Sequence, residues 1–176
     1  MKLYKKSLWA LMVLFFMGTS AIGFAQQAKY CVIDSKYILE KLPEYERAEK
    51  QIEQFSEKWE AEVENAMNAI EKMYRSYQTE RPMLSENARQ KREEEIITKE
   101  REAKELQKQY FGYEGKLFQK RQELIQPIQD KVFNAVQQYA KSNNYEIIYD
   151  KSGGITIFYS EAHLDKSEEI IKLIQK

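Results

Sequence analysis

The chain has 176 residues, of which 32% are charged, and its mean hydropathy of −0.71 is polar. It contains 28 basic and 28 acidic residues, and this balance argues against nucleic-acid binding through phosphate neutralisation. Because only 6 Gly and 3 Pro are present, the composition favours long solvated helices over a compact globular domain. The 12 Tyr and a regular apolar pattern argue against disorder.

The first 25 residues are predicted to be a secretory signal peptide that is cleaved after Ala25. Three lysines, Lys2, Lys5 and Lys6, precede an apolar run of ten residues that spans residues 8–17. This run is well short of the ~20 residues that span a bilayer, which disfavours the alternative of a retained membrane anchor. We therefore expect an exported protein. Its processed form has 25 basic and 28 acidic residues, a net charge of −3.

A β-branched and aromatic run over residues 29–34 predicts a first strand, and Asp34 is a good N-cap for a short helix after it. Pro43 is suited to the first position of the long helix that follows. In that helix, apolar residues recur at alternating steps of three and four, a spacing typical of a coiled-coil seam. They are Tyr45, Ala48, Ile52, Phe55, Trp59, Val63, Ala66, Ile70, Met73 and Tyr77.

Pro82 predicts a turn, with the tip near residues 80–86 and Ser85 as N-cap of a returning helix that runs to Asn143. The interior glycines Gly112 and Gly115 mark a bend or a close helix contact, and Pro127 predicts a kink where the arm meets its base. The returning helix repeats the seam at Ala103, Leu106, Tyr110, Tyr113, Leu117, Leu124, Ile128, Val132, Ala135 and Tyr139.

The two seams predict an antiparallel hairpin in which the numbers of paired residues add up to about 169. Three contacts follow from this register: Trp59 with Tyr110, Phe55 with Tyr113, and Ile52 with Leu117.

Residues 145–150 read as a second strand, 151–154 as a hairpin turn and 155–159 as a third strand. A capping box between Asp165 and Glu168 predicts the start of the last helix. The predicted fold is α+β and mainly α, with a long antiparallel helical-hairpin tentacle inserted in a small three-stranded β body. The tentacle spans residues 44–127, and the body comprises residues 26–43 and 128–176. So small a sheet is expected to oligomerise.

No metal, cofactor or catalytic site is predicted. Cys31 is interpreted as a buried residue of the first strand, with pairing between subunits as the alternative. His163 has no second His or Cys nearby in sequence and is interpreted as a turn residue. The carboxylates of Glu93, Glu94 and Glu95 lie on a solvated helix, which offers no pocket to exclude water or shift their pKa values.

Several short motifs resemble the Skp/OmpH family of periplasmic chaperones, and the resemblance covers the whole mature region. They are residues 30–39, 43–45, 83–85, 126–128, 145–153 and 165–170. The resemblance implies a homotrimer in which a small β-barrel holds three tentacles around a cavity. It also implies ATP-independent binding of unfolded outer-membrane proteins. Family members often have a basic surface, from which this near-neutral chain departs, so membrane contact is expected to be at most peripheral.

A second apolar stripe lies beside the seam and supplies the predicted client contacts. Its members are Met67, Tyr74, Ile97, Phe111, Phe118 and Ile125, with Lys104 completing the series. All but Ile125 and Lys104 are predicted to contact clients, because Met and aromatic side chains adapt to many sequences. The alternative is that the stripe widens the hairpin interface or packs on the body.

The predicted oligomerisation core consists of apolar residues of the three strands: Val32, Ile33, Ile147, Ile148, Ile155, Ile157 and Tyr159. The alternative to a holdase chaperone is an envelope spacer or scaffold protein that uses the coiled-coil arm to bind one folded partner.

Overall fold

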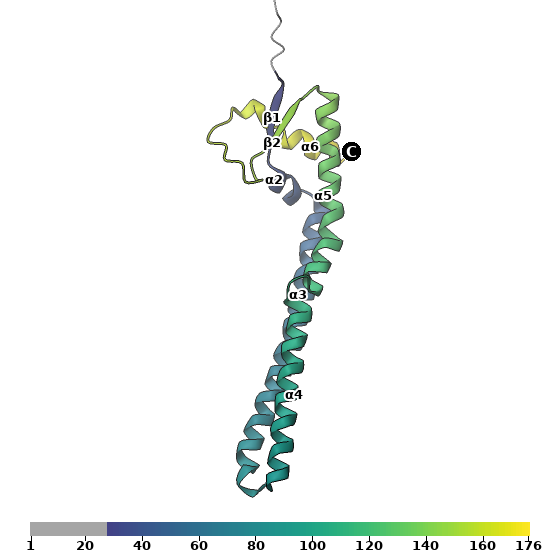
Figure 1. The fold of residues 1–176 in the computed structure, drawn as a ribbon. Helices are drawn as coiled ribbons and strands as arrows, with labels where there is room; N and C mark the ends of the chain where they lie inside the picture. Colours follow the sequence, from purple (N-terminus) through teal and green to yellow (C-terminus); the bar gives the residue numbers. More distant parts are fainter. Residues whose placement is uncertain (1–27) are drawn as a thin grey trace, which may run out of the picture.

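The computed structural model describes residues 28–176, so the predicted signal peptide and its cleavage site lie outside the described residues. Figure 1 shows a small body at one end and a long helical hairpin, the arm, that projects from it. In chain order the elements are β1 (Tyr30–Ile33), α2 (Ser35–Glu40), α3 (Pro43–Glu80), η1 (Arg81–Met83), α4 (Glu86–Phe111), α5 (Lys116–Ser142), β2 (Ile147–Asp150), η2 (Ala162–Leu164) and α6 (Ser167–Ile174).

The predicted helix starts are confirmed along the arm. The Asp34 carboxylate accepts a hydrogen bond of 2.9 Å from the Tyr37 amide and caps α2. Pro43 is the first residue of α3, whose 38 residues span about 57 Å at 1.5 Å per residue. The Ser85 hydroxyl accepts from the Ala88 amide at 3.4 Å and caps α4.

The predicted capping box of the last helix is not formed. The α6 helix begins at Ser167, whose amide and hydroxyl both donate to the Asp165 carboxylate, at 2.9 Å and 2.6 Å. Ser167 Oγ also accepts from the Asp34 amide at 2.9 Å. The start of α6 is therefore tied to the end of β1, an interaction that local sequence rules do not anticipate.

The body contains a parallel two-stranded sheet in which Tyr30 lies opposite Ile147 and Ile33 lies opposite Asp150. The prediction of a third strand at residues 155–159 is wrong. Residues 155–159 follow the predicted turn but form no strand, and no backbone hydrogen bond within residues 28–176 involves them. Strand propensity needs a neighbouring strand to be realised. The other edge of β1 already carries a bridge from Val32 to Asp165, which leaves the short outer edge of β2 free.

One apolar core joins the body to the lower part of the arm. Its buried residues come from β1, α2, α3, α5 and α6 and the link before α3: Ile33, Ile38, Leu42, Ala48, Ile52, Ile125, Ile128, Val132, Ala135, Ile170 and Ile171. The α5 helix continues through Pro127 in this region. Among residues 28–176, no helix combines the length and apolar character that a membrane span requires.

The returning half of the arm is broken at residues 112–115, so the prediction of one uninterrupted helix is wrong and that of a bend is confirmed. Glu114 has a φ of 55°, in the left-handed region. A Cβ at Gly112 would lie 2.4 Å from the Lys108 carbonyl oxygen, and one at Gly115 would lie 2.8 Å from that of Tyr110. The break therefore requires glycine at both positions.

The break changes the register of the hairpin. On the tip side Trp59 stacks on Tyr110, with ring centroids 5.1 Å apart, and the paired numbers add up to 169 as predicted. On the body side Lys131 Nζ lies 2.7 Å from the Glu44 carboxylate, and the numbers add up to 175. The predicted contact of Phe55 with Tyr113 is wrong because Tyr113 is 97% exposed at the break.

The third predicted contact, Ile52 with Leu117, lies just on the body side of the break. Ile52 is buried in the apolar core and Leu117 packs against that core, so the contact between the two stays a prediction.

Candidate binding surfaces

Polar contacts between the two halves of the arm line one edge, here called the linked edge. Glu44 and Glu62 on α3 and Lys131 on α5 each precede a seam residue by one position. Glu44 pairs with Lys131, and the Glu62 carboxylate accepts a hydrogen bond from the Tyr110 hydroxyl. These contacts hold the helices side by side without using apolar surface.

The opposite edge, here called the apolar edge, carries the five predicted client contacts. Each of them immediately follows a seam residue, and one residue rotates a helix by about 100°. Because the two halves are antiparallel, the same rotation about each axis brings these side chains to the same edge. They are Met67 after Ala66, Tyr74 after Met73, Phe111 after Tyr110, Phe118 after Leu117, and Ile97 after Ile96, which is buried one heptad before the seam residue Ala103.

Most of the apolar edge is open to solvent. Met67, Tyr74, Ile97 and Phe118 are exposed, and Phe111 is half-buried with its ring edge-on to Tyr110. Ile125, which the sequence pattern places in the same stripe one heptad after Phe118, is buried in the core that joins the arm to the body. The contact of these residues with clients stays a prediction.

Tyr113 is an exposed aromatic residue that the sequence pattern does not identify. A heptad pattern extended through residues 112–115 places Tyr113 in the seam instead. The glycines on either side, Gly112 and Gly115, are the signal that could have placed it in a break.

An aromatic and cationic cluster packs beside the break. The Trp59 ring stacks between Phe55, at 5.4 Å, and Tyr110, at 5.1 Å. Lys116 Nζ lies 4.9 Å from the Tyr110 ring centroid, and Lys120 Nζ lies 5.4 Å from that of Phe55. The hydrogen bond to Glu62 raises the pKa of the Tyr110 hydroxyl. This cluster connects α3, α4 and α5 at the level where the register changes.

The two faces of the body sheet differ in burial. Cys31 and Ile33 point to one face and are buried, as predicted for Cys31, whose pKa is raised by burial. Tyr30, Ile147 and Tyr149 share the other face and are exposed, with the Tyr30 and Tyr149 ring centroids 6.4 Å apart. Val32 lies on the same face but is buried, so this face is open only in part. An apolar sheet face that is open to solvent marks an interaction surface.

The predicted oligomerisation residues are divided between these environments. Val32 and Ile33 are buried within the chain, Ile148 and Ile157 are half-buried, and Ile147, Ile155 and Tyr159 are exposed. Their role in assembly stays a prediction.

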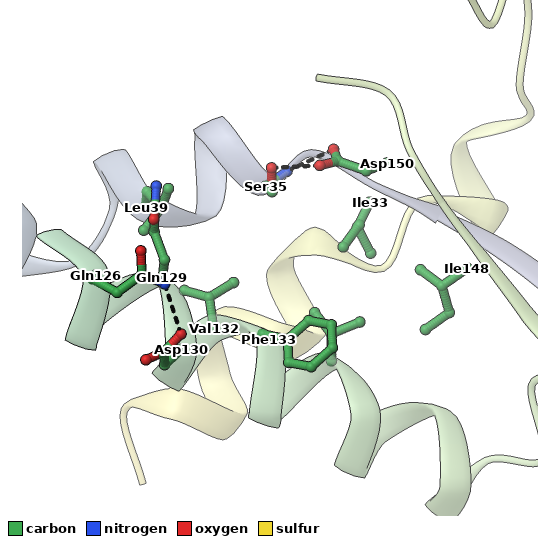
Figure 2. Close-up of a pocket in the computed structure, with 11 residues that line it drawn as sticks. Ile33, Ser35, Leu39, Gln126, Gln129, Asp130, Val132, Phe133, Ile148 and Asp150 are labelled. Carbon is green, nitrogen blue, oxygen red and sulfur yellow. Dashed lines mark hydrogen bonds between the residues drawn. The ribbon is translucent and has the colours of Figure 1, made fainter. Parts of the chain in front are cut away.

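A groove of about 480 Å³ opens beside β2, between the sheet, α2 and α5 (Figure 2). Its apolar wall is formed by Ile33, Leu39, Val132, Phe133, Val136 and Ile148. At its rim Ser35 donates to Asp150 through its amide, at 3.1 Å, and its hydroxyl, at 2.5 Å. Burial of Asp150 acts to raise its pKa, but these bonds and those from Ser152 lower it below its usual value.

Within residues 28–176, no group of three or more His, Cys, Asp or Glu side chains could hold a metal ion. The candidate sites are the apolar edge, the open sheet face and the groove. All three are surfaces suited to binding, and they lie on a long helical hairpin and the small body that carries it.

A family model described as "Outer membrane protein (OmpH-like)" matches residues 29–174, and the chain belongs to this family. The resemblance deduced from the sequence motifs is thereby confirmed. No curated protein matches the sequence. The fold is similar to the crystal structure of an OmpH-like candidate outer membrane chaperone from Caulobacter crescentus CB15. The TM-score is 0.69 at 8% sequence identity, and the match covers 84% of this chain and 83% of the other.

Proposed function

We propose that this protein is an ATP-independent holdase chaperone of the periplasm. It binds unfolded outer-membrane β-barrel proteins after export and keeps them from aggregating. Membership of the OmpH-like family supports a chaperone role. The observation that carries the proposal is the apolar edge, where both halves of the arm present exposed apolar side chains to the same side.

The chemistry of the apolar edge suits weak binding of many sequences. Met67 supplies a flexible thioether, and Tyr74 and Phe118 supply aromatic rings. These side chains are spaced along the arm among charged residues, so they form no continuous apolar patch. An unfolded chain can therefore make several weak contacts at once, and binding needs neither a fixed client sequence nor an enzymatic step.

We further propose that the protein functions as a homotrimer. One arm presents its apolar edge to solvent, whereas three arms around an axis can enclose a client between their apolar edges. The open sheet face, with Tyr30, Ile147 and Tyr149, supports assembly through the body. Closing three bodies into a barrel would remove the exposed sheet edges.

Membrane contact is at most peripheral in this proposal. The processed chain has a net charge of −3, which gives little attraction to an anionic lipid surface. Client capture thus depends on apolar contacts between the arms.

The test compares two quadruple variants in a light-scattering assay with a denatured outer-membrane β-barrel protein and no nucleotide. The first replaces Met67, Tyr74, Ile97 and Phe118 with Ser. The matched control replaces four exposed neutral residues of the arm outside the apolar edge with Ser: Gln51, Gln54, Asn65 and Gln109. The first variant should lose most of the suppression of aggregation, whereas the control should keep it.

Both variants should retain the wild-type helical circular dichroism. Equal suppression by the two variants would contradict the role of the apolar edge. A stoichiometric complex with one folded partner and no effect on aggregation would indicate the spacer instead.

A further inference from the structure

The break at residues 112–115 is an unfavourable feature in an arm made of helices. The α3 helix passes this level without interruption, so pairing of the two halves does not require a break. The returning half loses regular helix between Phe111 and Lys116, and Glu114 adopts a left-handed φ of 55°. Strained backbone of this kind persists only where the surrounding structure enforces it, and it is concentrated at functional sites.

The sequence enforces the break and leaves its middle residues outside the seam. A Cβ at Gly112 or Gly115 would lie 2.4 Å or 2.8 Å from a carbonyl oxygen of α4, so both positions exclude larger residues. The paired residue numbers rise from 169 on the tip side to 175 on the body side, so the returning half contains extra residues at this level. Gly115 is buried, whereas Tyr113 and Glu114 are exposed. The extra residues are thus displaced outward.

Tyr113 is the aromatic side chain that this displacement exposes. Its exposed fraction is 97%, and members of the apolar edge flank it along the chain. Phe111 ends α4 two positions before Tyr113, and Phe118 lies in the first turn of α5 after it. The break therefore adds an exposed ring between the part of the apolar edge on α4 and the part on α5.

The rings that pack beside the break are already occupied. Trp59 stacks on both Phe55 and Tyr110, with ring centroids 5.4 Å and 5.1 Å away. A lysine ammonium group also lies over each of these two partner rings, 5.4 Å from the Phe55 centroid and 4.9 Å from that of Tyr110. Within residues 28–176 no such contact involves Tyr113, so its ring is free to receive one from another molecule.

We propose that Tyr113 is a further client contact, and that its ring gives the arm a preference for aromatic over aliphatic side chains of an unfolded client. This inference rests on the proposed holdase function and specifies which side chains the arm selects. Aromatic rings attract each other by offset stacking or edge-to-face contact, a gain beyond the burial of apolar area. Membrane-spanning β-barrels carry girdles of aromatic residues, so an unfolded outer-membrane protein offers many such rings.

The first test measures the affinity for a labelled, denatured outer-membrane β-barrel protein that is diluted from urea into the processed chaperone. Fluorescence anisotropy should show that Tyr113→Ser binds roughly 3- to 10-fold more weakly than wild type, the loss expected for one aromatic pair. Tyr113→Phe should bind within about twofold of wild type. The matched control is Glu114→Asn, because Glu114 is the exposed neighbour in the break and Asn tolerates its left-handed backbone. It should keep the wild-type affinity.

A second variant tests whether the break positions the ring. Combined Gly112→Ala and Gly115→Ala substitutions leave Tyr113 in the sequence but force the backbone around it to rearrange. The affinity should fall to the level of Tyr113→Ser, with wild-type helical circular dichroism outside the break. Wild-type affinity in this variant would overturn the positioning by the break, and the Tyr113→Ser measurement would still decide the contact.

The preference for aromatic side chains is tested with two unfolded model clients of equal length and charge. One carries Phe and Tyr, and the other carries Leu at the same positions. Wild type should bind the aromatic client roughly threefold or more tightly, and Tyr113→Leu should reduce this preference. An equal preference in wild type and Tyr113→Leu would overturn the selection of aromatic side chains by Tyr113.

The outcomes separate this contact from the proposed function. A wild-type protein that does not suppress aggregation would contradict the holdase function, and the contact with it. Suppression by wild type together with unchanged affinity in Tyr113→Ser would overturn only the contact. An equal loss of affinity in Glu114→Asn would show that the shape of the break matters and not the ring, which would also overturn the contact.

Discussion

The body and the outer part of the arm are stabilised in different ways. In the body several elements surround Ile38, Leu42 and Ile170, none of which is more than 1% exposed. The outer arm has only two helices, and even its best-buried large side chains, Tyr77, Ile96 and Tyr110, each keep 7% of their surface in contact with water. Two helices cannot enclose a side chain on all sides, so the outer arm gains less from burial than the body.

Because of this difference, one chain can combine a stable fold with exposed apolar side chains. The body supplies most of the apolar burial, and the outer arm can therefore carry exposed Met67, Tyr74 and Ile97 without endangering the fold. Hydrogen bonds such as Tyr77 to Glu93 maintain the pairing of the outer helices where apolar burial is small. Four substitutions test this difference between body and arm.

The largest effect is expected from Ile170→Ala. Ile170 is 0% exposed, and its helix packs on α5 and α2, so the cavity should lower the free energy of unfolding by about 3–4 kcal/mol. Urea denaturation followed by circular dichroism, at one fixed protein concentration, measures it. Ile97→Ala, on the 61% exposed arm residue, is the control and should change stability by less than about 0.5 kcal/mol. Similar losses of unfolding free energy in the two variants would mean that burial in the body does not stabilise the fold more than exposed residues of the arm.

Trp59→Ala should have the next largest effect, about 2–3 kcal/mol, but confined to the arm. The change removes the stack on Phe55 and Tyr110 at the level where the register changes. Amide hydrogen exchange should accelerate between residues 60 and 110 and stay slow in β1 and β2. Equal acceleration in the strands would show that arm and body unfold as one unit.

Asp150→Asn should cost the body about 1 kcal/mol at neutral pH, because Asp150 accepts hydrogen bonds from the amides and hydroxyls of Ser35 and Ser152. The pKa of Asp150 is lowered in the fold, despite burial, by these bonds. Its contribution is therefore present above the unfolded pKa near 4 and is lost as the pH falls through the folded value. Thermal melts from pH 6 to pH 2 should show a smaller acid loss in the variant than in wild type. An unchanged acid profile would exclude Asp150 as a source of acid sensitivity.

The smallest effect is expected from replacing Tyr77 and Tyr110 with Phe. Hydrogen bonds to Glu93 and Glu62 raise the pKa of the two hydroxyls. A raised folded pKa means that the stabilisation is complete below the unfolded value near 10 and is lost as the pH rises through the folded value. The double variant should melt slightly earlier at pH 8 and lose less stability between pH 9 and pH 12. A steeper alkaline loss in the variant would contradict these bonds.

Much of the arm could be predicted from the sequence because its rules are local. Pro43, Ser85 and the heptad spacing specify helix starts and a buried stripe within a few residues of themselves. The same stripe led to the pairing of Trp59 with Tyr110. The prediction failed beyond Gly112, because a heptad can be extended only while the helix is continuous. Tyr113 lies in the break and is exposed, and Ile125 is buried in the core that the arm shares with the body.

The candidate surfaces also divide into features that follow from local sequence rules and features that depend on distant residues. The five residues of the apolar edge could be identified from their place beside the seam, but not which of them stay exposed in the fold. The groove and the tie between Ser167 and the Asp34 amide join residues more than 90 positions apart. Periodicity within one element carries no information about such pairs.

The helical-hairpin arm and its seam follow from the sequence, because helix phase and capping depend on neighbouring residues, and the family follows from short motifs. The register on either side of the break, the two-stranded sheet and the groove beside β2 become visible only in the folded chain. These depend on which distant surfaces meet and on how much apolar area each meeting removes from water. Residues 155–159 mark the boundary between the two: their sequence has strand character, and the fold of one chain leaves them without a neighbour.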